Sequence, residues 1–222
     1  MGWTDPTGGP AVTGNVAPAS LWNTYARDNI KILGRDIAPF RHVGTTDMEI
    51  WYACGQGEAT NVSLTDSSAF TTNTLFAVPF IAPRNSTIDR IAFEQISTGA
   101  GNARCGIYKT ISDTNMYPGA LVVDGGQYDL NVSAGVKATT ISTALPDCYY
   151  WAVLINSSGA VTFRRLLSTM PLIGFPSTLG STPQMTASRT QTYGALPSTF
   201  PASPFTSLTV GPAPLIGVRF SG

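Results

Sequence analysis

The side chains best suited to catalysis are few in this sequence, and their spacing matches no common active site. A single histidine, His42, occurs among 222 residues, so a serine or cysteine nucleophile has only one candidate base. The sequence contains no GxSxG elbow, no phosphate-binding glycine loop and no HExxH metal motif. We therefore expect a protein that is not an enzyme and that needs no cofactor or metal.

Paired carboxylates are the one alternative, because glycoside hydrolysis needs only two acids held a fixed distance apart. The acids that lie in or beside predicted strands are Asp89, Glu94, Asp124 and Asp129. With 13 Asp and Glu residues in the chain, some pair will lie close by chance. An enzyme acting on a surface polysaccharide is therefore kept only as the last of the hypotheses.

The three cysteines, Cys54, Cys105 and Cys148, are widely separated and form no CxxC pair of the kind used for zinc or redox chemistry. We expect them to serve as small buried apolar side chains in strands.

The start, MGWTDPTGGP, lacks the basic and apolar runs of a secretion signal, and no segment approaches the roughly 20 apolar residues that span a bilayer. Synthesis in a cytoplasm and no membrane partner are expected.

Charge is sparse and balanced. The 13 Lys and Arg residues equal the 13 Asp and Glu residues, and only 12% of the chain is charged, about half the usual share. Because no basic field exists to attract phosphates, nucleic acid is not an expected partner. A polar surface with little charge suits a protein that is built into a large assembly.

Residues 1–45 are predicted to form an extended arm followed by one short amphipathic α-helix. Gly and Pro interrupt every run within residues 1–19, so neither a helix nor a central strand is expected there. In SLWNTYARDNIKIL, residues 20–33, Ser20 is suited to cap the helix and Gly34 to end it. The apolar face of this helix is the predicted assembly interface and carries Trp22, Tyr25, Ile30 and Leu33.

A helix this short is marginal in water by itself, so its apolar face is expected to dock on something. Docking on another copy or on a partner protein is favoured, because the arm before the helix has little reason to exist in a monomer. The alternative is that the helix packs on the β-domain of its own chain and covers an open face.

Residues 46–222 are predicted to form an antiparallel β-sandwich, jelly-roll-like, because short β-prone runs alternate with turn signals such as YPG (117–119) and DGG (124–126). Residues 170–204 are too broken by Pro and Gly for strands and are expected to wrap over the sandwich as long loops. The predicted strands are 48–54, 75–81, 90–96, 104–109, 120–124, 127–132, 137–142, 148–156, 161–167, 205–210 and 214–220.

Three strands carry more specific predictions. CYYWAVLIN, residues 148–156, is apolar on both faces, which is typical of a central strand. RIAFE alternates, so Ile91 and Phe93 are expected to face inward and the charged residues beside them outward. Pro79 in LFAVPFI predicts an edge strand or a bulge, because proline cannot donate to a ladder.

Tyrosines near turns are the candidate contacts for a glycan. The aromatic cluster YYW, residues 149–151, lies in the most apolar strand and is expected to pack in the core. Tyr108, Tyr117 and Tyr128 lie nearer to turn signals and are the better candidates for an exposed surface. A host-surface glycan is therefore one candidate partner.

Two stretches resemble structural proteins of tailed bacteriophages. The run VTGNVAPASLWNTYARDNIKIL, residues 12–33, is similar to a leader in which the pattern TG..V..A..WNT..RDN...L precedes a β-rich body. The run APRNSTIDRIAFEQISTGAGNARCGIYKT, with YPGALVVDGGQYDL and ALPDCYYWAVL after it, resembles a β-sandwich module of phage tail, fibre and other virion proteins. Such modules tend to have Gly before the aromatic strand, where this chain has Asp147 and Cys148.

The resemblance implies a self-assembling protein of the virion, often trimeric in fibres, with other virion proteins as partners. It agrees with the arm, the docking helix and the inert sandwich expected from the residues alone. The first hypothesis is a structural protein of the tail fibre or baseplate appendage, made in the host cytoplasm. A capsid decoration protein is the close alternative, and a glycan-binding module for host attachment is the alternative of another class.

Overall fold

The computed structural model describes residues 51–54, 67–82, 85–112, 115–147, 149–166, 186–201, 208–209 and 213–221. All of them belong to Gly44–Gly222, the second of two units into which the chain divides. The predicted arm and helix lie outside the described residues, as do the boundary at residues 45 and 46, His42 and the four apolar helix residues, Trp22, Tyr25, Ile30 and Leu33.

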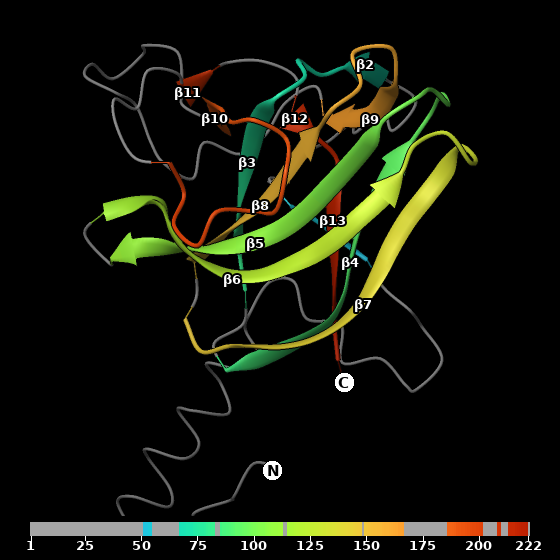
Figure 1. The fold of residues 1–222 in the computed structure, drawn as a ribbon. Coiled ribbons are helices and arrows are strands. Elements are labelled where there is room, and N and C mark those ends of the chain that lie inside the picture. The colour runs from blue at the N-terminus through green and yellow to red at the C-terminus, as the bar shows by residue number, and fades with distance from the viewer. Residues whose placement is uncertain are drawn as a thin grey trace, which may run out of the picture. The chain divides into compact units, whose positions relative to one another are not determined.

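The described residues form thirteen β-strands and no helix, so the prediction of a mainly β protein is confirmed. The strands make two antiparallel sheets (Figure 1). The first sheet runs β1 (Tyr52–Ala53), β13 (Ile216–Phe220), β4 (Ser86–Gln95), β9 (Thr162–Leu166) and β12 (Ala213–Pro214), with β2 (Ser67–Ala69) beside β9 and β7 (Gly135–Leu145) beside β4. The second runs β11 (Leu208–Thr209), β10 (Thr186–Thr190), β3 (Thr74–Ile81), β8 (Tyr149–Asn156), β5 (Asn102–Ser112) and β6 (Asn115–Asp129).

The two sheets share one apolar core, to which strands of both contribute. The alternation predicted for β4 is confirmed, since Ile91 and Phe93 are buried while the charged residues beside them are partly exposed. The Phe93 ring meets those of Tyr128 and Phe163 edge-on, with centroids 5.0 and 5.8 Å apart. Each large apolar side chain buried in this way contributes about 1.5–3 kcal/mol.

β8 is a central strand, as its sequence predicts. It pairs with β3 on one side and with β5 on the other. Tyr150 and Leu154 point into the shared core, whereas Trp151 and Val153 join a second buried cluster on the outer face of the second sheet. Because both faces are covered, a nearly continuous apolar run is needed along the strand.

Residues 191–201, which we call the strap, cover the outer face of the second sheet (Figure 1). Leu196 and Phe200 of the strap pack with Tyr108 and Trp151 in the second cluster. The backbone is tied down as well, because Leu121 N–H donates to Ser198 O at 2.9 Å and Phe200 N–H to Gly119 O at 2.7 Å. This confirms the predicted wrapping for residues 191–201.

One strand in the same region was not predicted. Thr186–Thr190 forms β10, which pairs with β3 from Thr74 to Ala77. Thr186 and Ala187 are buried, although the segment TASRT carries little apolar signal. The strand is stabilised by its place in the sheet and not by its local sequence.

Gly106 lets the strap lie directly on β5. A Cβ atom at this position would stand 2.3 Å from Leu196 Cδ1 and 2.6 Å from the carbonyl oxygen of Val123. The second of these is backbone and cannot move aside cheaply, so only glycine fits where the strap and β6 converge on this strand.

β6 is longer than its sequence predicts, and the turns placed at 117–119 and 124–126 are wrong. Residues 115–129 form one strand that pairs with β5 through several register shifts. Asp124 Oδ1 accepts the N–H of Gly126 at 2.9 Å, and Gly126 has a φ of +88°. Paired glycines signal a bulge as well as a turn, and here they bend the strand without ending it.

Pro79 lies in an inner strand, which corrects the prediction of an edge strand for residues 75–81. β3 lies between β10 and β8, and no register shift occurs at Pro79, which pairs with Trp151. However, β10 pairs with β3 only as far as Ala77. Among the described strands, Pro79 therefore has a neighbour on one side alone, where its missing N–H is tolerated.

Candidate functional site

The three tyrosines predicted to contact a glycan lie in different environments and do not form one surface. Tyr108 is completely buried under the strap, and its hydroxyl donates to Pro197 O at 2.7 Å. Burial raises the pKa of this phenol. The prediction of an exposed Tyr108 is therefore wrong, because the sequence does not show that the strap covers this part of β5.

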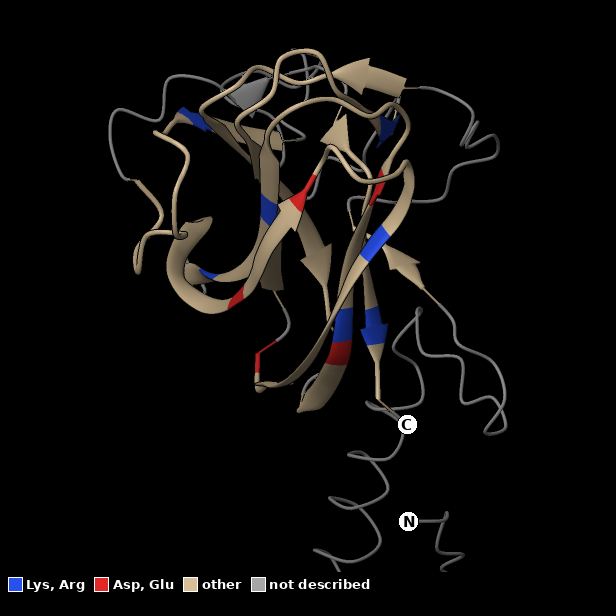
Figure 2. Cartoon of the chain, turned by 45° about the vertical axis from the view of Figure 1, so that its right-hand side comes forward, with Lys and Arg blue, Asp and Glu red and all other residues tan. Residues whose placement is uncertain are grey.

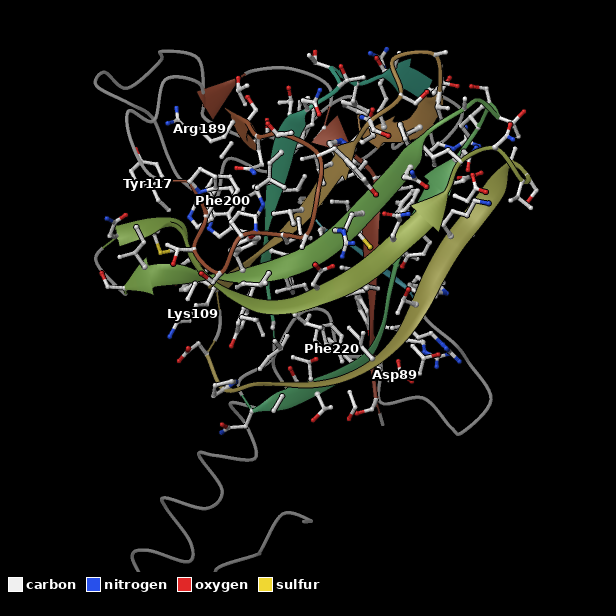
Figure 3. The ribbon with its side chains drawn as sticks, in the orientation of Figure 1. Asp89, Lys109, Tyr117, Arg189, Phe200 and Phe220 are labelled. Atoms are coloured by element: carbon white, nitrogen blue, oxygen red, sulfur yellow. The ribbon has the colours of Figure 1, made fainter. Side chains whose placement is uncertain are left out.

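Tyr128 and Tyr117 are both half-buried. The Tyr128 ring packs on Phe93 in the shared core, and its hydroxyl shares a hydrogen bond with Thr139 Oγ1. Tyr128 thus links β6 to β7 between the two sheets and offers little surface to a ligand. Tyr117 lies near the start of β6 (Figure 3), and its contact with a glycan stays a prediction.

The four acids considered for glycoside hydrolysis each accept hydrogen bonds within the fold. Two are in two-point pairs with arginines: Asp89 with Arg219 at 2.8 and 2.6 Å, and Glu94 with Arg164 at 2.9 and 3.0 Å. Asp124 accepts from Arg104 at 2.8 Å and from the N–H groups of Gly126 and Leu196, and Asp129 accepts from Asn131 N–H at 2.8 Å.

These pairs favour the ionised acids. The hydrogen bonds from Arg219 hold the pKa of Asp89 below its usual value, and those from Arg164 do the same for Glu94. A glycosidase needs one acid whose pKa is raised so that it can donate a proton to the leaving group. Asp89 and Glu94 are shifted in the opposite direction, toward structural ion pairs.

The lowered pKa values predict a loss of stability in acid. Both acids have lower pKa values in the folded state than the reference values of 3.8 and 4.5. Their contribution is therefore complete above about pH 5 and is lost as the pH falls through the folded-state values. We expect at most about 1 kcal/mol per pair, since both carboxylates are partly solvated.

Thermal melts between pH 7 and pH 3 measure this loss. The double variant Asp89→Asn, Glu94→Gln should show a flatter fall in melting temperature with pH than the wild type. Asp129→Asn is the matched control, because an amide oxygen still accepts the Asn131 N–H. Equal pH dependence in the double variant and the wild type would contradict the role given to these pairs.

Two of the three cysteines, Cys54 and Cys105, are buried thiols in the shared core, as predicted. Burial raises the pKa of Cys105 to about 12 and also raises that of Cys54. Nearly all of each thiol is therefore protonated at neutral pH and unreactive. The side chain of Cys148 lies outside the described residues.

An alkylating or disulfide reagent at pH 8 should therefore modify no more than one of the three cysteines in the native protein and all three in denaturant. Peptide mapping should find Cys54 and Cys105 protected in the native sample. Labelling of either one at the rate of a free thiol would show that the two sheets separate in solution.

A small hollow lies on the second sheet, between residues of β3, β5, β6 and β8. Its volume is about 10 Å³, enough for a single water molecule. It is lined by Pro79, Phe80, Thr110, Met116, Tyr149, Tyr150 and Trp151. Such a small apolar hollow does not accommodate a substrate.

No cluster of three or more His, Cys, Asp or Glu residues suited to a metal occurs in the described part of the chain. The same residues include no helix long and apolar enough to cross a membrane. Among the residues coloured in Figure 2, which are the described ones, Lys and Arg lie interspersed with Asp and Glu over both sheets, without a broad field of one sign.

These features define a mainly β protein with two antiparallel sheets around a shared core and a strap over the second sheet. The sequence matches no protein family model and none of the curated proteins with which it was compared.

Proposed function

We propose that this protein is a structural component of a bacteriophage virion. Residues 1–45 anchor it through the arm and the apolar helix face, and residues 46–222 face outward as a β-sandwich of the jelly-roll type. The leader-like run at residues 12–33 and the module-like run at 82–110 support this assignment. The protein is a homo-oligomer, with a trimer favoured, and its partners are other virion proteins.

The structural observation that supports the proposal is that the candidate acids and two of the cysteines of the described unit are engaged or buried within the fold. Its candidate acids accept hydrogen bonds from arginines and backbone N–H groups, two of its thiols are buried, and the strap seals one outer face. A unit of this kind suits display on a particle, because it has little tendency to associate through its core residues.

Within the virion, a tail fibre or baseplate appendage is the first choice, since similar leaders occur on such proteins. A capsid decoration protein is the alternative, and it needs the same combination of adhesive arm and inert domain. Locating the chain in intact particles by cryo-electron microscopy separates the two positions.

Deletion of residues 1–19 tests the anchoring role. The truncated protein should be soluble and should melt within about 2 °C of the wild type, because the core of the two sheets is intact, yet it should not enter particles. A variant with a Gly/Ser segment of equal length in place of the arm controls for chain length. Normal incorporation of either variant would make the proposed anchor wrong.

A glycan-binding module for host attachment is the second candidate function. It is favoured by one specific observation: the outer face of the first sheet carries an exposed tryptophan, Trp51, together with the polar side chains of Arg90, Thr140 and Glu94.

A further inference from the structure

The outer face of the first sheet carries a row of small residues across four strands. The strand registers place Ala53 beside Gly217, Gly217 beside Ala92, and Ala92 beside Ala138. Their chain neighbours Ile91 and Val218 are buried in the shared core, so this row points to the opposite face of the sheet. We call these four residues the floor.

Larger residues stand on both sides of the floor, two positions away along each strand. On one side the registers place Arg219, Arg90 and Thr140 next to one another, and on the other side they place Glu94 beside Val136. Two residues along a strand cover about 6.6 Å, so the two rows are roughly 13 Å apart. We call these two rows the walls, and the floor and walls together, which cross β1, β13, β4 and β7, the trough. Within the trough Ala138 is exposed, whereas Ala92 is only 4% exposed.

Trp51 stands at the β1 end of this trough. Gly217 has no side chain, and a Cβ atom built there would lie 3.3 Å from Trp51 Cε3. The indole therefore lies over the floor at Gly217. Trp51 is 37% exposed, whereas Trp151 in the second cluster is 1% exposed. One edge of the indole is thus held against the sheet while part of its surface faces solvent.

The polar groups of the walls are held in fixed orientations. Arg90 donates to Thr140 Oγ1. Arg164 of β9 donates two hydrogen bonds, of 2.9 and 3.0 Å, to the carboxylate of Glu94. A carboxylate has about four acceptor sites and a guanidinium five N–H donors, so the two bonds of the Glu94–Arg164 pair leave further capacity on both groups. That capacity lies on the same face of the sheet as Trp51.

We propose that this trough binds an oligosaccharide. The apolar face of one sugar ring stacks on Trp51, and hydroxyl groups of this and the following rings exchange hydrogen bonds with Thr140, Arg90 and the Glu94–Arg164 pair. Three interstrand spacings separate β1 from β7, about 14 Å in all, so the trough suits a short chain of sugars more than a single ring.

A saccharide fits this surface better than a protein helix does. Docking of a helix depends on burying large apolar side chains in pockets, and the floor offers only Ala and Gly. A sugar needs instead one aromatic surface and several planar groups that donate and accept in fixed directions. The inference deepens the host-attachment candidate and is independent of the anchoring role of residues 1–45.

The test uses the full-length protein and a printed array of neutral and acidic oligosaccharides from bacterial capsules and lipopolysaccharides. The wild type should bind at least one member of the array. Trp51→Ala should lower the affinity for that oligosaccharide by about tenfold or more. Tyr149→Ala is the control for an exposed aromatic residue outside the trough, and its affinity should be unchanged.

A second pair of variants separates binding in the trough from loss of folding. Ala138→Arg fills the floor, whereas Ala144→Arg places the same side chain on the same face of β7, about 20 Å farther along. Both should melt like the wild type, and only Ala138→Arg should lose binding. The proposal is overturned if the wild type binds no member of the array, or if Trp51→Ala and Ala138→Arg both keep wild-type affinity. Normal particle incorporation by non-binding variants would leave the structural role intact.

Discussion

Replacing Phe200 with alanine is expected to lower the free energy of unfolding by about 3–5 kcal/mol and the melting temperature by roughly 6–20 °C. Phe200, labelled in Figure 3, comes from the strap and is buried in the second cluster. Its ring meets that of Tyr108 edge-on, with centroids 5.4 Å apart. Truncation leaves a cavity between the strap and the second sheet that the β5 backbone cannot fill. Calorimetry measures the loss directly.

The neighbouring variant Thr199→Ala is the matched control, because Thr199 is exposed and contributes a backbone bridge to Ala120 that the change leaves in place. It should alter the stability by no more than about 0.5 kcal/mol. In Phe200→Ala, increased proteolysis within the strap should accompany the lower melting temperature. A shift of less than about 2 °C would mean that the strap is not docked in solution.

Replacing Trp22 with alanine is expected to weaken assembly by about 10²- to 10³-fold or more while hardly changing the melting temperature of the isolated protein. The large effect follows from the predicted helix, whose apolar face is expected to be buried only against a partner. Loss of a buried Trp costs about 3–5 kcal/mol, and each 1.4 kcal/mol is a factor of ten in binding. Sedimentation or particle incorporation measures assembly, and calorimetry measures stability.

The polar face of the same predicted helix supplies the control. Asn23→Ala removes a side chain expected to face solvent and should leave both assembly and stability unchanged. If the helix packs instead on the β-domain of its own chain, Trp22→Ala should lower the melting temperature by several degrees. That result would make the docking-helix hypothesis wrong.

The strands with strong periodicity could be predicted from the sequence, because their burial follows from local pattern alone. β8 is apolar on both faces, and it is central. β4 alternates, and it has one buried face. β2 and β10 carry no such pattern and are defined by pairing with β9 and β3, so their positions depend on contacts distant in sequence. The role of Gly125 also depends on a contact distant in sequence. A Cβ atom there would lie 2.9 Å from the carbonyl oxygen of Cys105, so this glycine permits close packing of β6 on β5 and does not belong to the predicted turn.

The surface was harder to predict than the core. Proximity to a turn suggested that Tyr108 is exposed, but exposure depends on the strap, which lies about 90 residues away in the chain. Trp51 could have been singled out, since strand alternation places it on the face opposite to Tyr52. What the sequence does not show is that Ala53, Gly217, Ala92 and Ala138 align beside it, because that requires the registers of four strands.

The position of β13 constrains how this protein can be made. This strand follows all twelve others in the sequence, yet it lies between β1 and β4 in the first sheet, where Ile216 and Val218 are buried. A nascent chain therefore cannot complete the first sheet before residues 216–220 have left the ribosome. Until then β1 and β4 are not joined by β13 and apolar surface is exposed, so the first sheet is completed late, through contacts of large sequence separation.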